Sequence, residues 1–268
     1  MTKDFTVIVG TQRSGTTVTR SILGSHPKVT TFGEVFLPRD YHLRENYYRY
    51  LRDRCAERPF YAIPIESNQQ DLFEGYLKRL SHLSGKAADH IVMDCKTQFL
   101  RGGLNLGGLF GEHPYLLTLM KSHGFKFIGV RRENKLGMYV SQILSARTRV
   151  WATSDPEGLE DRTVYVPTTR LRQRLEEMVE EDRDIEDLLH RSQCYEMVIY
   201  EEMYQDPSRV STETLTRIAN LMEVSDEFDP VPRYRKIGLP LDQAIRNFDD
   251  VVSALGPEGA KRFVDPYV

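Results

Sequence analysis

Short apolar runs alternate along the chain with longer segments in which apolar residues recur every three or four positions. Runs rich in β-branched residues predict buried strands, and the longer periodic segments predict helices. The predicted strands are 5–9, 28–32, 91–93, 125–130 and 195–200. The predicted helices are 16–24, 71–83, 114–123, 134–147, 170–191, 207–222 and 242–255, with 40–60 as a further helical segment. The segments interpreted as irregular are 60–70, 101–112 and 225–241.

Strands and helices alternate in this way along almost the whole chain. The alternation predicts an α/β fold of three layers, P-loop-like, in which helices cover both faces of a central, mostly parallel sheet. Because there is no repeat or low-complexity linker, we expect residues 1–268 to form a single domain. Ligands of such sheets bind where strands end and helices begin. The loops to search for chemistry are therefore those after Val9, Phe32, Met93 and Val130.

The composition is that of an ordinary globular protein. Of the 268 residues, 40% are hydrophobic and 28% are charged, and the formal net charge is −3. Such a chain lacks the basic excess with which proteins bind nucleic acid or membrane surfaces, so an anionic ligand would need a local cluster of cations. No stretch approaches the length of a membrane span, and the first residues contain no apolar signal core.

The three cysteines, Cys55, Cys95 and Cys194, are far apart in the sequence. An odd number of scattered cysteines is typical of reduced thiols rather than of a disulfide framework or a zinc site. Together with the missing signal core, this pattern leads us to expect a cytoplasmic protein. No cluster of histidines and carboxylates has the spacing of metal ligands, so no metal is expected.

The loop after the first predicted strand has the spacing of a phosphate-binding loop. Gly10 and Gly15 are separated by four residues, and Thr16 follows at the start of a helix. Backbone N–H groups in such a turn converge on an anion, and the helix N-terminus adds partial positive charge. The lysine of ATPases and kinases would stand at position 16, but the nearest cation is Arg13. The alternative is a strand–helix turn without a ligand, in which Ser and Thr act as caps.

A carboxylate, Glu34, follows the second predicted strand, between Gly33 and apolar residues. Apolar neighbours would shield Glu34 from water, and a desolvated carboxylate suits a general base. A surface glutamate is an equally good interpretation of the spacing alone.

A second basic cluster follows strand 125–130. Arg131 and Arg132 end that strand, and Ser141 lies about two turns into the next helix. An arginine can bind a phosphate through two parallel hydrogen bonds, and a serine hydroxyl can complete the site. The alternative is a solvated arginine pair in an ion pair with Glu133. Further cations in the loop-like tail are Arg233, Arg235 and Lys236.

Two separate basic clusters on an acidic chain fit a ligand that carries two separate phosphates. Taken in order, the motifs resemble those of sulfotransferases that use 3′-phosphoadenosine-5′-phosphosulfate (PAPS). Within that superfamily the chain looks like the bacterial branch of Nod-factor and trehalose sulfotransferases. The resemblance extends from residue 5 to about residue 255, and the first loop alone would be a weak signal. The matching segments are 11–17, 33–36, 131–136, 139–141, 147–151, 200–202, 206–207, 235–236 and 245–249.

The resemblance implies the transfer of a sulfuryl group from PAPS to an acceptor hydroxyl, which releases adenosine 3′,5′-bisphosphate (PAP). Glu34 would be the general base, Arg13 would stabilise charge on the leaving group, and Lys96 could reach the transferring group or the acceptor. The residues expected to hold the 5′-phosphosulfate are Thr11, Gln12, Arg13, Ser14, Gly15, Thr16 and Thr17.

The resemblance also implies a separate site for the 3′-phosphate. Arg132 and Ser141 would hold this phosphate, with help from Arg235 and Lys236. The spacing to Ser141 favours Arg132 over Arg131, although the sequence does not decide between the two arginines.

The chain departs from the animal cytosolic members of the superfamily in three ways. Arg13 replaces their loop lysine, their catalytic histidine has no counterpart, and their C-terminal dimer motif is not present. Their base and their dimer mode are therefore not expected here, and a homodimer is suggested by analogy alone. Two other functions stay open: a P-loop kinase acting on a small molecule, and a nucleotide-binding module without turnover.

The motifs do not specify the acceptor. We expect insertions at 37–90 and 150–195 to shape its pocket, and 154–162 to be either a mobile lid or a surface loop. By family analogy the acceptor is a hydroxyl of a carbohydrate, a glycolipid or a small natural product, with an amine as a further option. Aromatic surface for a sugar is offered by Tyr41, Tyr47, Tyr48 and Tyr50.

Overall fold

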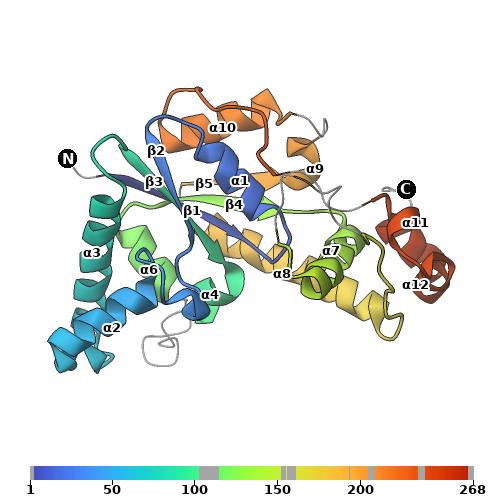
Figure 1. Ribbon diagram of the computed structural model, residues 1–268, viewed down its shortest axis with the longest axis horizontal. Coiled ribbons are helices and arrows are strands. Elements are labelled where there is room, and N and C mark those ends of the chain that lie inside the picture. The colour runs from blue at the N-terminus through green and yellow to red at the C-terminus, as the bar shows by residue number, and fades with distance from the viewer. Residues whose placement is uncertain are drawn as a thin grey trace.

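A five-stranded sheet forms the centre of the protein, as seen in a computed structural model (Figure 1). The structure describes residues 3–102, 115–151, 155, 161–192, 194–204, 209–234 and 239–264. Neighbouring strands are all parallel, and their order is β2-β3-β1-β4-β5. The parallel sheet predicted from the alternating pattern is confirmed.

The five strands lie where the apolar runs predicted them. They are β1 (Asp4–Gly10), β2 (Val29–Glu34), β3 (His90–Lys96), β4 (Lys126–Arg131) and β5 (Tyr195–Ile199). The strand β3 extends past its predicted end at Met93, because Asp94 and Lys96 contact each other and are buried together. The strand β2 also extends past its predicted end at residue 32 to Glu34, and its pairing with β3 shifts register between Phe32 and Glu34.

Helices cover both faces of the sheet (Figure 1). Side chains alternate along a strand, so Val7 and Val9 of β1 enter one apolar cluster and Ile8 enters another. The cluster around Val7 includes residues of α2 (Tyr47–Glu57), α3 (Glu66–Leu83), α6 (Tyr115–Ser122) and α8 (Leu171–His190). The cluster around Ile8 includes residues of α1 (Thr16–Leu23) and α10 (Thr212–Met222). The three-layer α/β/α fold is thereby confirmed.

A third apolar cluster lies beside the sheet and brings in the C-terminal helices. It joins α7 (Lys135–Thr148) and α8 to α11 (Leu241–Ala244) and α12 (Phe248–Phe263). The Asn247 side chain fastens these helices to the 161–166 segment, because it accepts from the N–H of Val166 at 2.9 Å and donates to its carbonyl at 3.0 Å. The remaining short helices are η1 (Pro38–Asp40), η2 (Pro59–Ala62), α4 (Thr97–Gly102) and α9 (Tyr200–Met203).

Some predicted boundaries were wrong. The helix α3 begins at Glu66 instead of residue 71, so the segment 60–70 is helical in part. The helix α10 begins at Thr212 instead of residue 207, because the Ser211 hydroxyl caps its first turn. The helix α12 continues beyond residue 255 through a bend at Gly256, where φ is 67°.

Several parts of the sequence prediction fall outside the described residues, among them most of the glycine-rich segment 101–112 and most of the segment 154–162. Among the helices that the structure does describe, none combines the length and the hydrophobicity needed to cross a bilayer.

Candidate active site

The loop after β1 lies at the middle of the sheet edge where all five parallel strands end. Gly10, the last residue of β1, pairs in register with Lys96 of β3 on one side and with Val130 of β4 on the other. The chain runs from β1 to one half of the sheet through β2 and β3, and then returns to the other half through β4 and β5. A reversal of this kind is where open α/β sheets bind their ligands.

The backbone of this loop presents hydrogen-bond donors without acceptors. Within the described part of the chain, the N–H groups of Arg13, Gly15, Thr16 and Thr17 donate to no other group. No side chain caps α1, so the positive end of this helix is also uncompensated. Both features fit an anion bound in front of the loop.

Left-handed backbone at two residues gives the loop its shape. Gly15 has φ 110° and Arg13 has φ 67°. A Cβ atom on Gly15 would collide with the ring of Tyr200, which packs against the loop. Glycine at position 15 is therefore required both by the backbone conformation and by the space that Tyr200 fills.

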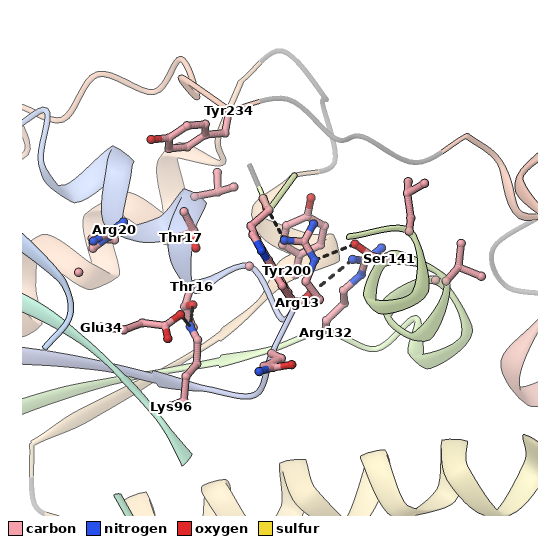
Figure 2. Close-up of a pocket in the computed structure, with 18 of the residues that line it drawn as sticks. Arg13, Thr16, Thr17, Arg20, Glu34, Lys96, Arg132, Ser141, Tyr200 and Tyr234 are labelled. Atoms are coloured by element: carbon pink, nitrogen blue, oxygen red, sulfur yellow. Dashed lines mark hydrogen bonds and ion pairs between the residues drawn. The ribbon is translucent and has the colours of Figure 1, made fainter. Parts of the chain in front are cut away.

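A cleft of about 400 Å³ opens in front of the loop. Figure 2 shows Arg13, Arg132 and Ser141 on one side of this cleft and Glu34 with Lys96 on the other. Among the described residues that line it are five cations and two carboxylates, so the cleft is positive although the chain as a whole is negative. The cations are Arg13, Arg20, Arg39, Lys96 and Arg132, and the carboxylates are Glu34 and Asp40.

The two predicted basic clusters meet on one side of the cleft. The Nε atom of Arg13 donates to the Ser141 hydroxyl at 2.9 Å, and its Nη1 donates to the carbonyl of Trp151. The Nη1 atom of Arg132 lies 3.4 Å from the carbonyl of Arg13. Burial and the neighbouring Arg132 guanidinium lower the pKa of Arg13 below its usual range. An anion between these two guanidinium groups would relieve their repulsion.

Arg132 faces the cleft, whereas Arg131 does not line it. Arg131 forms ion pairs with Glu133 at 3.4 Å and with Glu186 at 3.2 Å. The Arg132 guanidinium lies over the Tyr200 ring, 5.0 Å from its centroid. Its buried Nε atom has no hydrogen-bond partner among the described residues, and the nearest carboxylate oxygen, from Glu201, is 3.8 Å away.

A buried lysine links the loop to Glu34. Lys96 is 5% exposed, and its Nζ atom lies 3.0 Å from Asp94 and 3.5 Å from Glu34. The same atom donates to the hydroxyl of Thr16, the residue that stands where ATPases and kinases have their loop lysine. The loop thus contacts a lysine that arrives from the neighbouring strand β3 instead of from its own sequence.

The positions of the predicted site residues fall into three groups. Residues that line the cleft are Gln12, Arg13, Gly15, Thr16, Thr17, Glu34, Lys96, Arg132 and Ser141. The Thr11 and Ser14 side chains are buried and do not line it; the Ser14 hydroxyl donates to the Thr11 carbonyl at 2.9 Å, which stabilises the turn itself. Arg235 and Lys236 lie outside the described residues.

The structure also places residues here that sequence reasoning did not assign to the site. Asp94 is 1% exposed and anchors Lys96, and Tyr200 supports both the loop and Arg132. Arg20 lines the cleft beside Glu34, where its Nη1 atom would lie 2.7 Å from a Cβ on Gly33. An aspartate two residues before a strand-end lysine was an available signal for Asp94, whereas nothing in the sequence pattern pointed to Arg20. Among the described residues, no group of three His, Cys, Asp or Glu side chains could hold a metal ion.

Comparison with known proteins gives two kinds of match. Residues 6–95 match the family described as "Sulfotransferase family". A crystal structure of a sulfotransferase from Alicyclobacillus acidocaldarius has 16% identity and a TM-score of 0.45, and the match covers 97% of this chain and 94% of that chain. The sulfotransferase domain of the Synechococcus PCC 7002 olefin synthase has 17% identity and a TM-score of 0.45, and the match covers 98% of this chain and 88% of that chain.

No curated protein matches the chain. The family match covers β1 from Thr6 onward, the loop after β1, β2 with Glu34, and all of β3 except Lys96. This match confirms the resemblance to the sulfotransferase superfamily over residues 6–95.

Proposed function

We propose that this protein is a PAPS-dependent sulfotransferase that transfers a sulfuryl group to an acceptor hydroxyl. The observation that carries the proposal is that the phosphate loop and the Arg132–Ser141 pair face the same cleft, with Glu34 across from them. PAPS carries a phosphosulfate on the 5′-oxygen and a phosphate on the 3′-oxygen of one ribose, so it needs two cationic sites that share one crevice. An ordinary mononucleotide site would need only one.

The hydrogen-bond donors that lack partners among the described residues match the 5′-phosphosulfate and the 3′-phosphate of PAPS. The free N–H groups of the loop would bind the 5′-phosphosulfate. Arg132 and the Ser141 hydroxyl would bind the 3′-phosphate, since the buried Nε of Arg132 lacks a hydrogen-bond partner within the described residues. Arg235 and Lys236 remain proposed helpers at this second phosphate.

In the proposed reaction the acceptor oxygen attacks sulfur and forms the new S–O bond. The bond between sulfur and the bridging phosphate oxygen breaks, and its electron pair leaves with PAP. Glu34 takes the acceptor proton, and the ion pair with Lys96 at 3.5 Å orients its carboxylate. Loop N–H groups, Arg13 and Lys96 stabilise the charge that develops on the bridging oxygen.

The acceptor side of the cleft is formed by other residues. Leu37, Arg39 and Leu43 line it beyond Glu34, in the first of the proposed insertions, 37–90 and 150–195. We propose a hydroxyl of a carbohydrate, a glycolipid or a small natural product, in keeping with the resemblance to the Nod-factor and trehalose branch. A cytoplasmic location, a homodimer and a single domain over 1–268 belong to the same proposal.

Binding of PAP tests the proposal against its two alternatives. PAP is expected to raise the melting temperature of the protein, and Mg-ATP to leave it unchanged, because ligands stabilise the state that binds them. A shift with Mg-ATP alone would favour the kinase. Transfer of ³⁵S from labelled PAPS to a panel of sugars, glycolipids and phenols separates an enzyme from a nucleotide-binding module, which would bind PAP and transfer nothing.

A further inference from the structure

A buried ion pair lies directly beneath the loop that carries Arg132. Lys135 of α7 and Asp182 of α8 are 3% and 4% exposed, and the Lys135 Nζ atom donates to Asp182 Oδ2. The same Nζ atom also donates to the backbone carbonyl of Arg132. The lysine therefore connects α8 to the backbone of Arg132, the cation of this loop that faces the cleft.

A second carboxylate holds the same loop from the other direction. The two oxygens of Glu201 accept from the backbone N–H groups of Glu133 at 2.9 Å and Asn134 at 3.0 Å. The Asn134 side chain then caps α7 by accepting from the N–H of Gly137 at 2.6 Å. The N–H groups of the loop are thus fixed by Glu201, and the carbonyl of Arg132 is fixed by Lys135.

The ion pair is not needed to hold α7 against α8. These helices already share an apolar cluster, to which Leu136 and Met138 contribute from α7 and Leu175 and Met178 from α8. A buried ion pair is also weak support for stability, because desolvation of the two charges offsets their attraction. Asp182 shows this cost directly: its Oδ1 atom is buried and accepts no hydrogen bond from any described residue.

We propose that Asp182 and Lys135 are positioning residues that orient Arg132 for the 3′-phosphate and so set the preference of the protein for PAP over nucleotides that lack this phosphate. The proposal rests on the proposed function, in which Arg132 binds that group. Asp182 holds the ammonium in place, the ammonium fixes the Arg132 carbonyl, and the fixed backbone aims the guanidinium into the cleft. Neither residue lines the cleft itself.

The test compares the binding of PAP and AMP, which differ by the 3′-phosphate, by isothermal titration calorimetry. The first variant, Lys135→Met with Asp182→Leu, removes both charges and replaces them with apolar side chains of similar size. The second, Asp182→Asn, keeps the shape of the pair and guards against a folding defect in the first. Ile185→Val, in the other apolar cluster that α8 contacts, is the control for a mild change in stability.

We expect the double variant to bind PAP about tenfold more weakly, the value of one hydrogen bond to a charged group, and AMP as the wild type does. Asp182→Asn is expected to change the PAP-to-AMP ratio in the same direction, and Ile185→Val to leave it unchanged. An unaltered ratio in both pair variants overturns the proposal while leaving the proposed function intact. A wild type that does not prefer PAP over AMP overturns the 3′-phosphate assignment and this proposal together.

Discussion

The Nε atom of Arg13 donates a 2.9 Å hydrogen bond to the hydroxyl of Ser141, although the two residues are 128 positions apart. This bond joins the loop after β1 to α7, the helix that follows β4, on the side of the cleft where Arg132 also lies. A single nucleotide in the cleft would therefore face both arginines. Substitutions on either side of the bond should be visible in nucleotide binding.

Arg132→Ala should weaken the binding of PAP far more than that of AMP. Loss of a charge-assisted hydrogen bond of about 1.5–3 kcal/mol corresponds to about 10- to 150-fold in affinity. The matched control is Arg131→Ala, because Arg131 has the same charge but pairs with Glu133 and Glu186 away from the cleft. Calorimetric titration of both variants with both nucleotides decides the matter, and equal losses for PAP and AMP would remove Arg132 from the 3′-phosphate site.

Glu34→Gln should preserve PAP binding and lower turnover by about 10²–10⁴-fold, the usual contribution of a general base. Glutamine keeps the size of the side chain but cannot take the acceptor proton. Glu74→Gln, on the exposed surface of α3, is the control. Initial rates of ³⁵S transfer give the comparison, and a variant with wild-type turnover would show that another group is the base.

Gly15→Ala should abolish nucleotide binding while leaving most of the fold intact. A methyl group at φ 110° is strained, and it would also push the Tyr200 ring away from its place under Arg132. Thermal shift with PAP measures the binding, and circular dichroism checks the fold. Gly85→Ala also introduces strain at a positive φ, but it meets no neighbouring atom and lies away from the cleft. That variant should retain the PAP shift.

Lys96→Met should destabilise the protein by about 3–5 kcal/mol, because it leaves the Asp94 carboxylate buried without its partner. The double variant Asp94→Leu with Lys96→Met should recover most of this stability. It should not recover turnover, since the loop would still lack its only lysine contact among the described residues. Urea denaturation and ³⁵S transfer report the two effects separately, and recovery of turnover in the double variant would argue against a role for Lys96 in the reaction.

His90 should make the protein less stable at mildly acidic pH. Burial lowers the pKa of His90 to about 4, from about 6.5 in an unfolded chain. Between these values the unfolded state binds the proton more readily, so stability is complete above pH 6.5 and declines as the pH falls toward 4. The full loss is on the order of 3 kcal/mol. The Nε2 atom of the neutral His90 ring shares a hydrogen bond of 2.7 Å with the Thr6 hydroxyl.

His90→Asn is the comparison for this pH effect, because asparagine does not titrate. Urea denaturation at pH 7.0, 6.0 and 5.0 should give a shallower decline for the variant than for the wild type, before most carboxylates begin to titrate. Parallel declines in the two proteins would assign the pH dependence to other groups.

The fold was predictable because each strand has its own apolar run and a parallel sheet follows from their alternation with helices. The prediction of strand ends was wrong where polar side chains pair with each other inside the sheet, as Asp94 and Lys96 do at the end of β3. Charged residues interrupt a hydrophobic pattern, so the pattern does not predict that a charge can be buried with a partner two residues away. The helix α3 begins before its predicted start for a different reason. The Asn68 side chain donates hydrogen bonds to the carbonyls of Phe60 and Ile63 and so orders a segment that is polar in sequence.

The candidate site was predictable as far as it lies in short motifs. The loop, Glu34 and the Arg132–Ser141 pair each occupy one stretch of sequence, and the sheet brings their ends to one edge. Contacts between distant segments were not predictable, because no local spacing encodes them. Tyr200 against Gly15, Lys96 against Thr16 and Lys135 against Asp182 are of this kind.

The position of β1 in the middle of the sheet has a further consequence. The half with β2 and β3 supplies Glu34 and Lys96, and the half with β4 and β5 supplies Arg132, which faces the cleft from the other side. Under the proposed function, the base that activates the acceptor would come from one half of the sheet and the arginine that binds the 3′-phosphate from the other, while both halves pack into one apolar cluster around Val7. Under the same proposal, substitutions of Leu37, Arg39 and Leu43, which line the cleft beyond Glu34, should change the preferred acceptor more than the affinity for PAPS.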